Sequence, residues 1–122
     1  MSAALRFPAR KLKPYSEPVS AGALQVGATY FAVGFLDDAM LIPTVEPIVF
    51  IGTDLAQGGV PGELFFQDAA SYRKGVRFES AVDTDGSRFT IQPPEQVGPI
   101  FEFEHALELL LACSLRRGER LR

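Results

Sequence analysis

Short apolar segments that glycine and proline interrupt fill most of this chain, and this pattern limits the folds open to it. Among 122 residues there are 11 Gly and 9 Pro. Because these two residues end regular elements, the middle of the chain favours several short β-strands joined by turns. Helical periodicity persists only over residues 100–117. A chain of this length is expected to form one domain and to bury a core without disulfides.

The strand predictions rest on apolar runs and on alternation. Ile48–Ile51 is a continuous apolar run that ends at Gly52, which predicts a buried strand. Residues 28–36 carry apolar side chains on both alternating faces, which is typical of a central strand covered on both sides. The remaining strands are expected at residues 63–67, 76–79 and 88–91, the last two joined as a hairpin by a turn that contains an Asp-Gly step.

Two local signals add detail to this pattern. Pro43 and Pro47 lie four residues apart, and because proline has no amide hydrogen, they favour a bulge or an edge position. Asp68 precedes a short segment with helical character, residues 69–74, as a candidate N-cap. Gly75 follows as the expected end of that helix.

The C-terminal segment predicts the one long helix, over residues 100–117, with Gly118 as its end. Its core-facing stripe is expected to include four large side chains buried against the sheet: Phe103, Leu107, Leu110 and Leu111. Cys113 is the only cysteine and lies in a leucine-rich stretch, so we interpret it as a small buried hydrophobe rather than as a nucleophile.

Together these elements predict an α+β fold. The expected architecture is a bent antiparallel sheet, or a small half-open barrel, of about five short strands packed by one C-terminal helix. Residues 1–18 contain three prolines and no period, which predicts an extended basic N-terminal arm before a single α+β domain at 19–122. The chain shows neither a signal-peptide pattern nor a membrane-length apolar run, so we expect a cytoplasmic protein.

The charges of the chain are unevenly distributed. Eight of the 12 cations lie in residues 6–13 and 116–122, whereas residues 14–72 hold seven acids and no Lys or Arg. An acidic body argues against a nucleic-acid-binding core, which needs a basic face. Two arrangements remain open for the basic ends: they fold back on the acidic body, or they stay free as tails.

The chemistry that the sequence offers is sparse. His105 is the only histidine, with Glu102 and Glu108 three residues away on either side. This spacing supplies half of a carboxylate-bridged di-metal site, but the second helix that such a site needs is missing. We therefore expect a surface histidine beside two glutamates, no metal and no other cofactor. Nothing in the chain resembles a catalytic triad, a zinc motif or a phosphate-binding glycine loop.

Two connectors carry the candidate binding residues, and no catalytic residue is predicted. One connector places Asp68, Tyr72 and Arg73 between predicted strands, where a rigid scaffold can hold a binding site. The other places Asp37 and Asp38 between apolar flanks. The simpler alternatives are a plain turn for the acidic pair and a core aromatic for Tyr72.

These features favour a small bacterial-type domain that acts as a non-catalytic protein-interaction or accessory module with an acidic surface. Its partner would be another protein or a further copy of the chain, with no membrane partner and no nucleic-acid partner, except through the basic ends. The alternative is a small-molecule-binding protein or metal-dependent enzyme that uses four side chains: Asp37, Asp38, Glu102 and His105. The sequence identifies no small-molecule ligand, and no motif in it is specific enough to identify a family.

Overall fold

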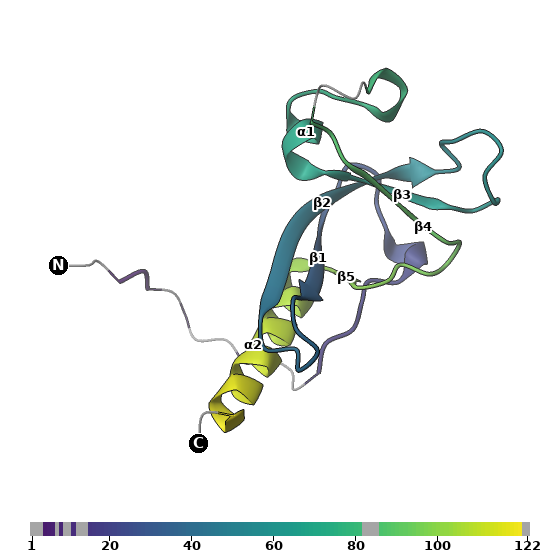
Figure 1. Ribbon diagram of the computed structural model, residues 1–122. Coiled ribbons are helices and arrows are strands. Elements are labelled where there is room, and N and C mark those ends of the chain that lie inside the picture. Colours follow the sequence, from purple (N-terminus) through teal and green to yellow (C-terminus); the bar gives the residue numbers. More distant parts are fainter. Residues whose placement is uncertain (1–3, 7, 9–10, 12–14, 82–85, 121–122) are drawn as a thin grey trace.

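The computed structural model describes residues 4–6, 8, 11, 15–81 and 86–120. Within these residues the chain forms a single sheet, two α-helices and two short 3-10 helices (Figure 1). In chain order the elements are η1 (Ala21–Ala23), β1 (Thr29–Phe35), β2 (Pro43–Thr53), β3 (Leu64–Asp68), α1 (Ala69–Arg73), η2 (Phe78–Ser80), β4 (Phe89–Gln92), β5 (Ile100–Phe101) and α2 (Phe103–Arg120).

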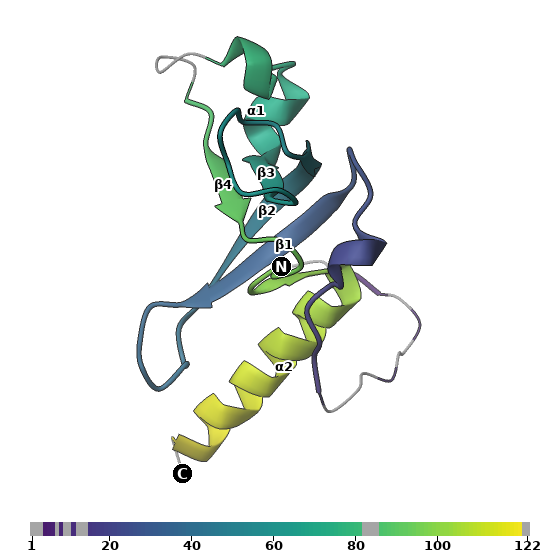
Figure 2. The same cartoon turned by 90° about the vertical axis from the view of Figure 1, so that its right-hand side faces the viewer.

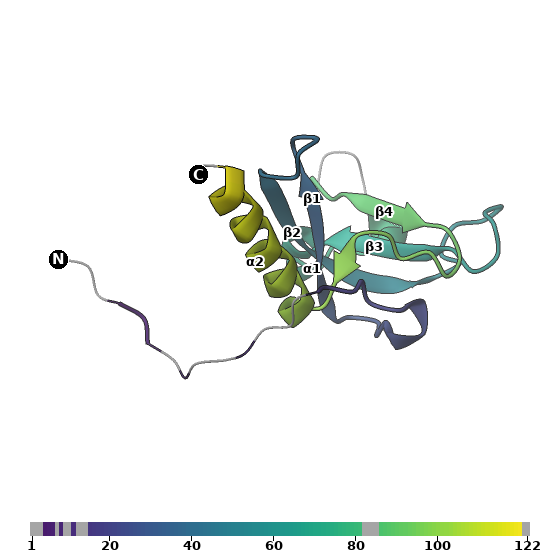
Figure 3. The ribbon, with the colours of Figure 1, turned by 90° about the horizontal axis from the view of Figure 1, so that it is seen from below.

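The sheet is antiparallel throughout, with the strand order β4-β3-β2-β1-β5. It stays open, and α2 packs beside β1 and β5 (Figure 3). The short helix α1, which follows β3, lies at the opposite end of the sheet from α2 (Figure 2). The predicted α+β fold, with a bent antiparallel sheet and a C-terminal helix, is therefore confirmed.

The long strand β2 shows why its two prolines are tolerated. Pro43 and Pro47 pair with β1 only, because β3 begins to pair with β2 at Ile48. The first half of β2 is therefore an edge on its second side, as the prolines predict. Farther along, the register with β3 shifts between Phe50 and Gly52, and the φ of +139° at Gly52 belongs to a region that glycine tolerates best.

Two buried clusters hold the sheet together. The larger one joins sheet residues to the segments before β1 and before β5, with these members: Val19, Tyr30, Ile48, Phe50, Leu64, Phe66, Val97 and Ile100. A bond of 2.9 Å from the amide of Val19 to the carbonyl of Ile100 ties the first of these segments to β5. The smaller cluster joins Val33 and Phe101 to Ala106, which docks the start of α2.

The strand predicted at 76–79 is wrong. These residues lead into η2, and β4 pairs with β3 instead of forming a hairpin with them. The alternating pattern has another cause: the Phe78 ring packs edge-to-face against Phe65 and Phe89, at centroid distances of 5.3 and 5.2 Å. The predicted turn at 83–87 falls partly on residues 82–85, which lie outside the described residues.

Both predicted ends of the terminal helix need correction. Ile100 and Phe101 form the strand β5, whose pairing with β1 sets Phe101 opposite Phe31, so α2 begins only at Phe103. At its other end α2 continues through Gly118 to Arg120. Glycine lowers helix stability without terminating every helix, and no Pro follows here to enforce an end.

The predicted core face of α2 is also wrong. Phe103, Leu107 and Leu111 are 61%, 38% and 40% exposed, and only Leu110 of the predicted set is half-buried. The helix docks through Ala106, Leu109 and Cys113. Apolar side chains project from most of the circumference of α2, so the spacing of its residues is compatible with two core-facing stripes. The stripe with the smaller side chains faces the sheet. Cys113 is 2% exposed, which confirms its expected burial.

Half of the predicted N-terminal arm lies outside the described residues, namely 1–3, 7, 9–10 and 12–14. Where the description resumes, the Ser16 hydroxyl donates a hydrogen bond to the His105 carbonyl, which places this part of the chain beside the first turn of α2. In the described part of the chain, no helix combines the length and the apolar character that crossing a membrane requires.

Candidate functional site

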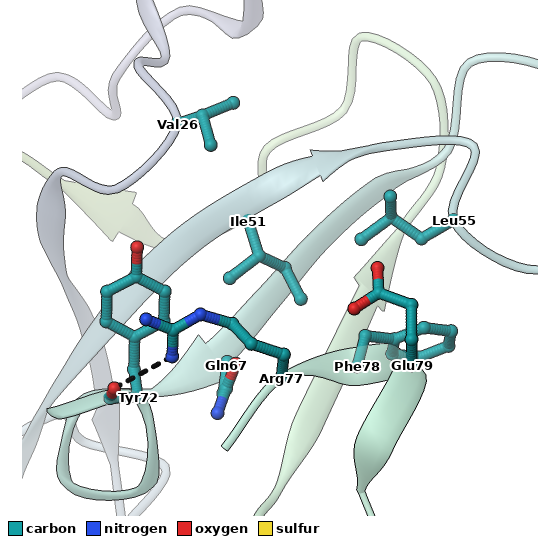
Figure 4. A pocket seen from close by; sticks show the side chains of 8 residues that line it. All are labelled: Val26, Ile51, Leu55, Gln67, Tyr72, Arg77, Phe78 and Glu79. Atoms are coloured by element: carbon teal, nitrogen blue, oxygen red, sulfur yellow. Dashed lines mark hydrogen bonds between the residues drawn. The ribbon is translucent and has the colours of Figure 1, made fainter. Parts of the chain in front are cut away.

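A cavity of about 140 Å³ opens beside α1 (Figure 4). Its walls come from four parts of the chain that the sheet brings together: the segment before β1, the end of β2, β3 with α1, and η2. The lining residues are Val26, Ile51, Leu55, Gln67, Tyr72, Arg77, Phe78 and Glu79. Polar groups thus meet an apolar wall in one small concave space, as in many ligand sites.

Gln67 forms the floor of this cavity and is fully buried. Its Nε2 donates to the Ser71 hydroxyl at 2.8 Å and to the Val76 carbonyl at 3.0 Å. Because a carbonyl only accepts, the Val76 contact fixes which end of the amide carries nitrogen. Gln67 Oε1 has no hydrogen-bond partner among the described residues. A buried acceptor without a partner costs about 1–3 kcal/mol, so this oxygen is an unsatisfied polar group beside the cavity.

Asp68 anchors the short helix α1. One carboxylate oxygen accepts the Ser71 amide at 3.0 Å, and the other accepts the Ser71 hydroxyl at 2.6 Å and the Arg88 amide at 2.8 Å. Burial by itself raises the pKa of Asp68, but these bonds favour the charged carboxylate and hold the pKa below its usual value of 3.8. Asp68 is thus the N-cap that the sequence predicts, and it positions Ser71 under the Gln67 amide.

Tyr72 and Arg77 form one side of the cavity. The Arg77 guanidinium lies 3.9 Å from the centre of the Tyr72 ring, and its Nη1 donates to the carbonyls of Tyr72 and Val76 at 2.9 and 2.8 Å. Gly27 lies close to the tyrosine hydroxyl, with a φ of +87° and only 3.5 Å between that oxygen and the position of a Cβ. The guanidinium is therefore held in place while Nε and Nη2 keep three further donors.

The predicted binding residues fall into two groups. Asp68 and Tyr72 belong to the corner around α1, and the neighbouring Arg73 is exposed outside the cavity lining. Asp37 and Asp38 lie instead in the turn between β1 and β2, at the α2 end of the sheet.

The Asp37 carboxylate closes its turn. Its Oδ1 accepts the amides of Leu41 and Ile42 at 3.0 and 2.8 Å. The same carboxylate lines a surface pocket with Arg117 and Arg120 from the end of α2. Part of the basic C-terminus thus lies beside an acid of the body.

The histidine site differs from the expected surface arrangement. His105 is half-buried and its Nδ1 lies 3.4 Å from Oε1 of Glu108, whose side chain is 2% exposed. Glu102, by contrast, is exposed. Among the described residues, no three His, Cys, Asp or Glu side chains gather as metal ligands. The alternative set of Asp37, Asp38, Glu102 and His105 is divided between the two ends of α2.

Three polar residues of the cavity, Gln67, Arg77 and Glu79, are not among the predicted binding residues. Gln67 follows three apolar residues in a strand, and a polar side chain in such a run was the signal that could have revealed it. The alternation of residues 76–79 predicts a strand for Arg77 and Glu79, whereas in the structure Arg77 is the N-cap of η2 and Glu79 lies within η2, both lining the cavity.

A second surface includes three residues that the helical spacing predicts as core, namely Phe103, Leu107 and Leu111, together with Leu115. Phe103, Leu107, Leu111 and Leu115 all lie on the outer side of α2, and Leu115 is 62% exposed.

Compared with known protein families, with curated proteins and with solved structures, the chain matches none, so its own geometry is the basis for a function.

Proposed function

We propose that this protein is a non-catalytic protein-interaction module that assembles through the outer face of α2, meaning the side chains of Phe103, Leu107, Leu111 and Leu115. The exposure of these four large apolar residues on one helix carries the proposal. A helix that is apolar on its outer as well as its inner face is normally covered on both. Contiguous apolar surface of this kind marks interaction sites in folded domains.

The spacing of the outer face suits a helical partner. Its four residues recur at every fourth position, which forms one continuous ridge along the helix, and such ridges pack into the grooves of another helix. Ser114 and Gly118 are exposed on the same side near the C-terminal end. Their small size allows a second helix to approach closely there.

The acidic side chains are less suited to be the main contact. The carboxylates of Asp37, Asp54 and Asp68 accept backbone amides of their own turns or caps. Glu46 pairs with Arg88. Four of the seven acids in residues 14–72 therefore have structural contacts, and the acidic surface acts in this proposal as a flank rather than as the centre of the interface.

The occupant that we propose for this face is α2 of a second copy, in antiparallel orientation. Exposed Glu102 and Glu104 lie at the start of α2, and exposed Arg117 and Arg120 lie in its last turn. Two antiparallel copies bring each acidic end to the other's basic end, and they also oppose the helix dipoles favourably. A two-fold axis uses the same patch on both copies, so the stripe is complementary to itself.

The oligomeric state tests this proposal. Sedimentation of the full chain over a dilution series should show a dimer that dissociates on dilution. Leu107→Glu combined with Leu111→Glu should give a monomer with unchanged circular dichroism, since both side chains are exposed in the single chain. Val60→Glu is the matched control, because Val60 is 61% exposed in a loop away from α2. A wild-type chain that is monomeric at every concentration would overturn the proposal.

Cross-linking tests the orientation. In an antiparallel pair centred between Leu107 and Leu111, Phe103 of one copy lies near Leu115 of the other. A mixture of the single variants Phe103→Cys and Leu115→Cys should therefore form a mixed disulfide dimer. Each variant alone should form little disulfide dimer, because in an antiparallel pair the two copies of the same residue lie far apart along the helix axis, which rises by about 1.5 Å per residue. Efficient cross-linking of Phe103→Cys alone would indicate a parallel pair and contradict the model.

A further inference from the structure

We propose that the cavity beside α1 binds a small zwitterion, a free α-amino acid with a short aliphatic side chain. The cavity is at the opposite end of the sheet from α2, so this inference is independent of the assembly through that helix. Three features carry it: an unpaired buried acceptor, a fixed cation and an acidic edge, all around an apolar wall.

The buried acceptor is Gln67 Oε1. The amide nitrogen is held by Ser71 and Val76, so the side chain cannot turn to satisfy its oxygen without losing both bonds. Figure 4 shows the oxygen on the side of the cavity, toward Ile51, and the nitrogen on the far side. A ligand here must bring a hydrogen-bond donor, and an ammonium group brings three.

The fixed cation is Arg77. Stacking on Tyr72 and two bonds from Nη1 hold the guanidinium in place. The donors on Nε and Nη2 form the fork that binds a carboxylate through two parallel hydrogen bonds. None of these donors has an acceptor among the described residues. A bound carboxylate would therefore displace no interaction that this part of the chain provides.

The acidic edge is Glu79, which lies across the cavity from Tyr72, near Leu55 (Figure 4). Its carboxylate and Gln67 Oε1 both accept hydrogen bonds, which suits an ammonium group. The opposite charge of Arg77 suits the carboxylate of the same ligand. A ligand with both groups neutralises both sides of the site, whereas a simple anion or cation leaves one charge unmatched.

The remaining wall is apolar and selects the side chain. Ile51, Leu55 and Phe78 line it. The volume of about 140 Å³ is close to that of cavities that hold one benzene-sized group, about 150 Å³. Side chains with three or four carbons fit this space, which points to valine and leucine as ligands.

Titration with defined probes tests the ligand class. L-Leucine and L-valine, added to the full chain and followed by calorimetry and by amide NMR shifts, should bind and should shift the resonances of Gln67 and Tyr72. N-Acetyl-L-leucine lacks the ammonium group and L-leucinamide lacks the carboxylate. Each should bind at least about tenfold more weakly, which corresponds to the loss of one charged hydrogen-bonding contact.

Two exposed residues allow the site to be altered without touching the core. Arg77→Met should weaken leucine binding by at least about tenfold, and Glu79→Gln by a smaller factor. Arg73→Met is the matched control, because Arg73 is exposed on α1 but does not line the cavity. It should bind like the wild type. Thermal melting of each variant verifies that the fold is retained.

Several results would overturn the inference. One such result is that both leucine and valine fail to bind at millimolar concentration. Another is that the acetylated or amidated probe binds as well as leucine. Leucine binding that is unchanged in Arg77→Met would place the ligand elsewhere. The variant Leu107→Glu/Leu111→Glu should bind leucine as the wild type does, so failure of the α2 interface and failure of the ligand site are separately visible.

Discussion

The corner around α1 and the helix α2 hold their positions by different means. α1 has five residues, and hydrogen bonds of Asp68, Ser71 and Gln67 fix it to the sheet. α2 has 18 residues, docks mainly through small apolar side chains and leaves its other face uncovered. Hydrogen bonds are directional and fix the geometry of a site, whereas apolar contact is not directional and suits an interface that forms and separates. The difference suits a ligand site at one end of the sheet and an assembly surface at the other.

The sharpest test of this contrast replaces one phenylalanine in each region. Phe65 is fully buried and packs against Phe78, so Phe65→Ala should lower the free energy of unfolding by about 3–5 kcal/mol. Phe103 is mostly exposed and contacts Phe31 edge-to-face, so Phe103→Ala should cost about 1 kcal/mol. Urea unfolding at high dilution measures both. Equal losses would mean that the outer face of α2 is packed within the single chain.

A smaller loss is expected at the cap of α1. Asp68→Ala removes the acceptor of the Ser71 and Arg88 amides and should cost about 2 kcal/mol. Chemical denaturation measures the loss, and Asp38→Ala, in the exposed turn, serves as a control with little effect. A neutral Asp68→Ala would show that apolar packing rather than the cap holds α1.

The same carboxylate predicts a pH dependence. Because the pKa of Asp68 is lowered in the folded chain, its contribution to stability is complete above the unfolded-state pKa, whose usual value is 3.8, and is lost as the pH falls through the lower folded-state pKa. The stability difference between the wild type and Asp68→Asn should therefore be constant at neutral pH and shrink in acid. Denaturation midpoints over a pH series measure it. A difference that grows in acid would contradict the sign of the shift.

The last prediction concerns the rates at which thiols on the two faces of α2 react with a labelling reagent. Cys113 is buried, and its thiol should react slowly with thiol reagents in the native state. A thiol introduced by Leu115→Cys should react fast at high dilution and more slowly at concentrations where the dimer forms. Rapid labelling of Cys113 would show that α2 separates readily from the sheet.

The sequence predicted the elements of the fold better than their contacts. Strand positions in the middle of the chain followed from apolar runs, and the Asp68 cap from its residue type and position. The face of α2 could not be predicted, because apolar residues surround most of the helix and no spacing rule distinguishes its two stripes. The two stripes differ in side-chain size, as Ala106 and Phe103 illustrate. This difference identifies the buried stripe only when the space between α2 and the sheet is known.

The cavity was less predictable than the fold. Tyr72 was singled out as a candidate, but Gln67, Arg77 and Glu79 come from segments that were assigned to strands. The alternation of apolar and polar residues at 76–79 is compatible with a strand. It is equally compatible with a coil segment in which one ring, that of Phe78, packs against Phe65 and Phe89. Which of the two forms depends on the contacts of that ring with Phe65 and Phe89, which lie far away in sequence.

The margins of the sheet have a consequence for aggregation. β5 has two residues and β4 has four, and the half of β2 that pairs on one side only contains Pro43 and Pro47, which offer no amide donor. Short or proline-containing edges are poor templates for the addition of strands from another chain. Molecules that meet at high concentration are therefore directed away from open-ended β-polymerisation. An exposed apolar helix is compatible with such a sheet, because the two-fold pair that we propose through α2 is closed and does not grow into a fibril.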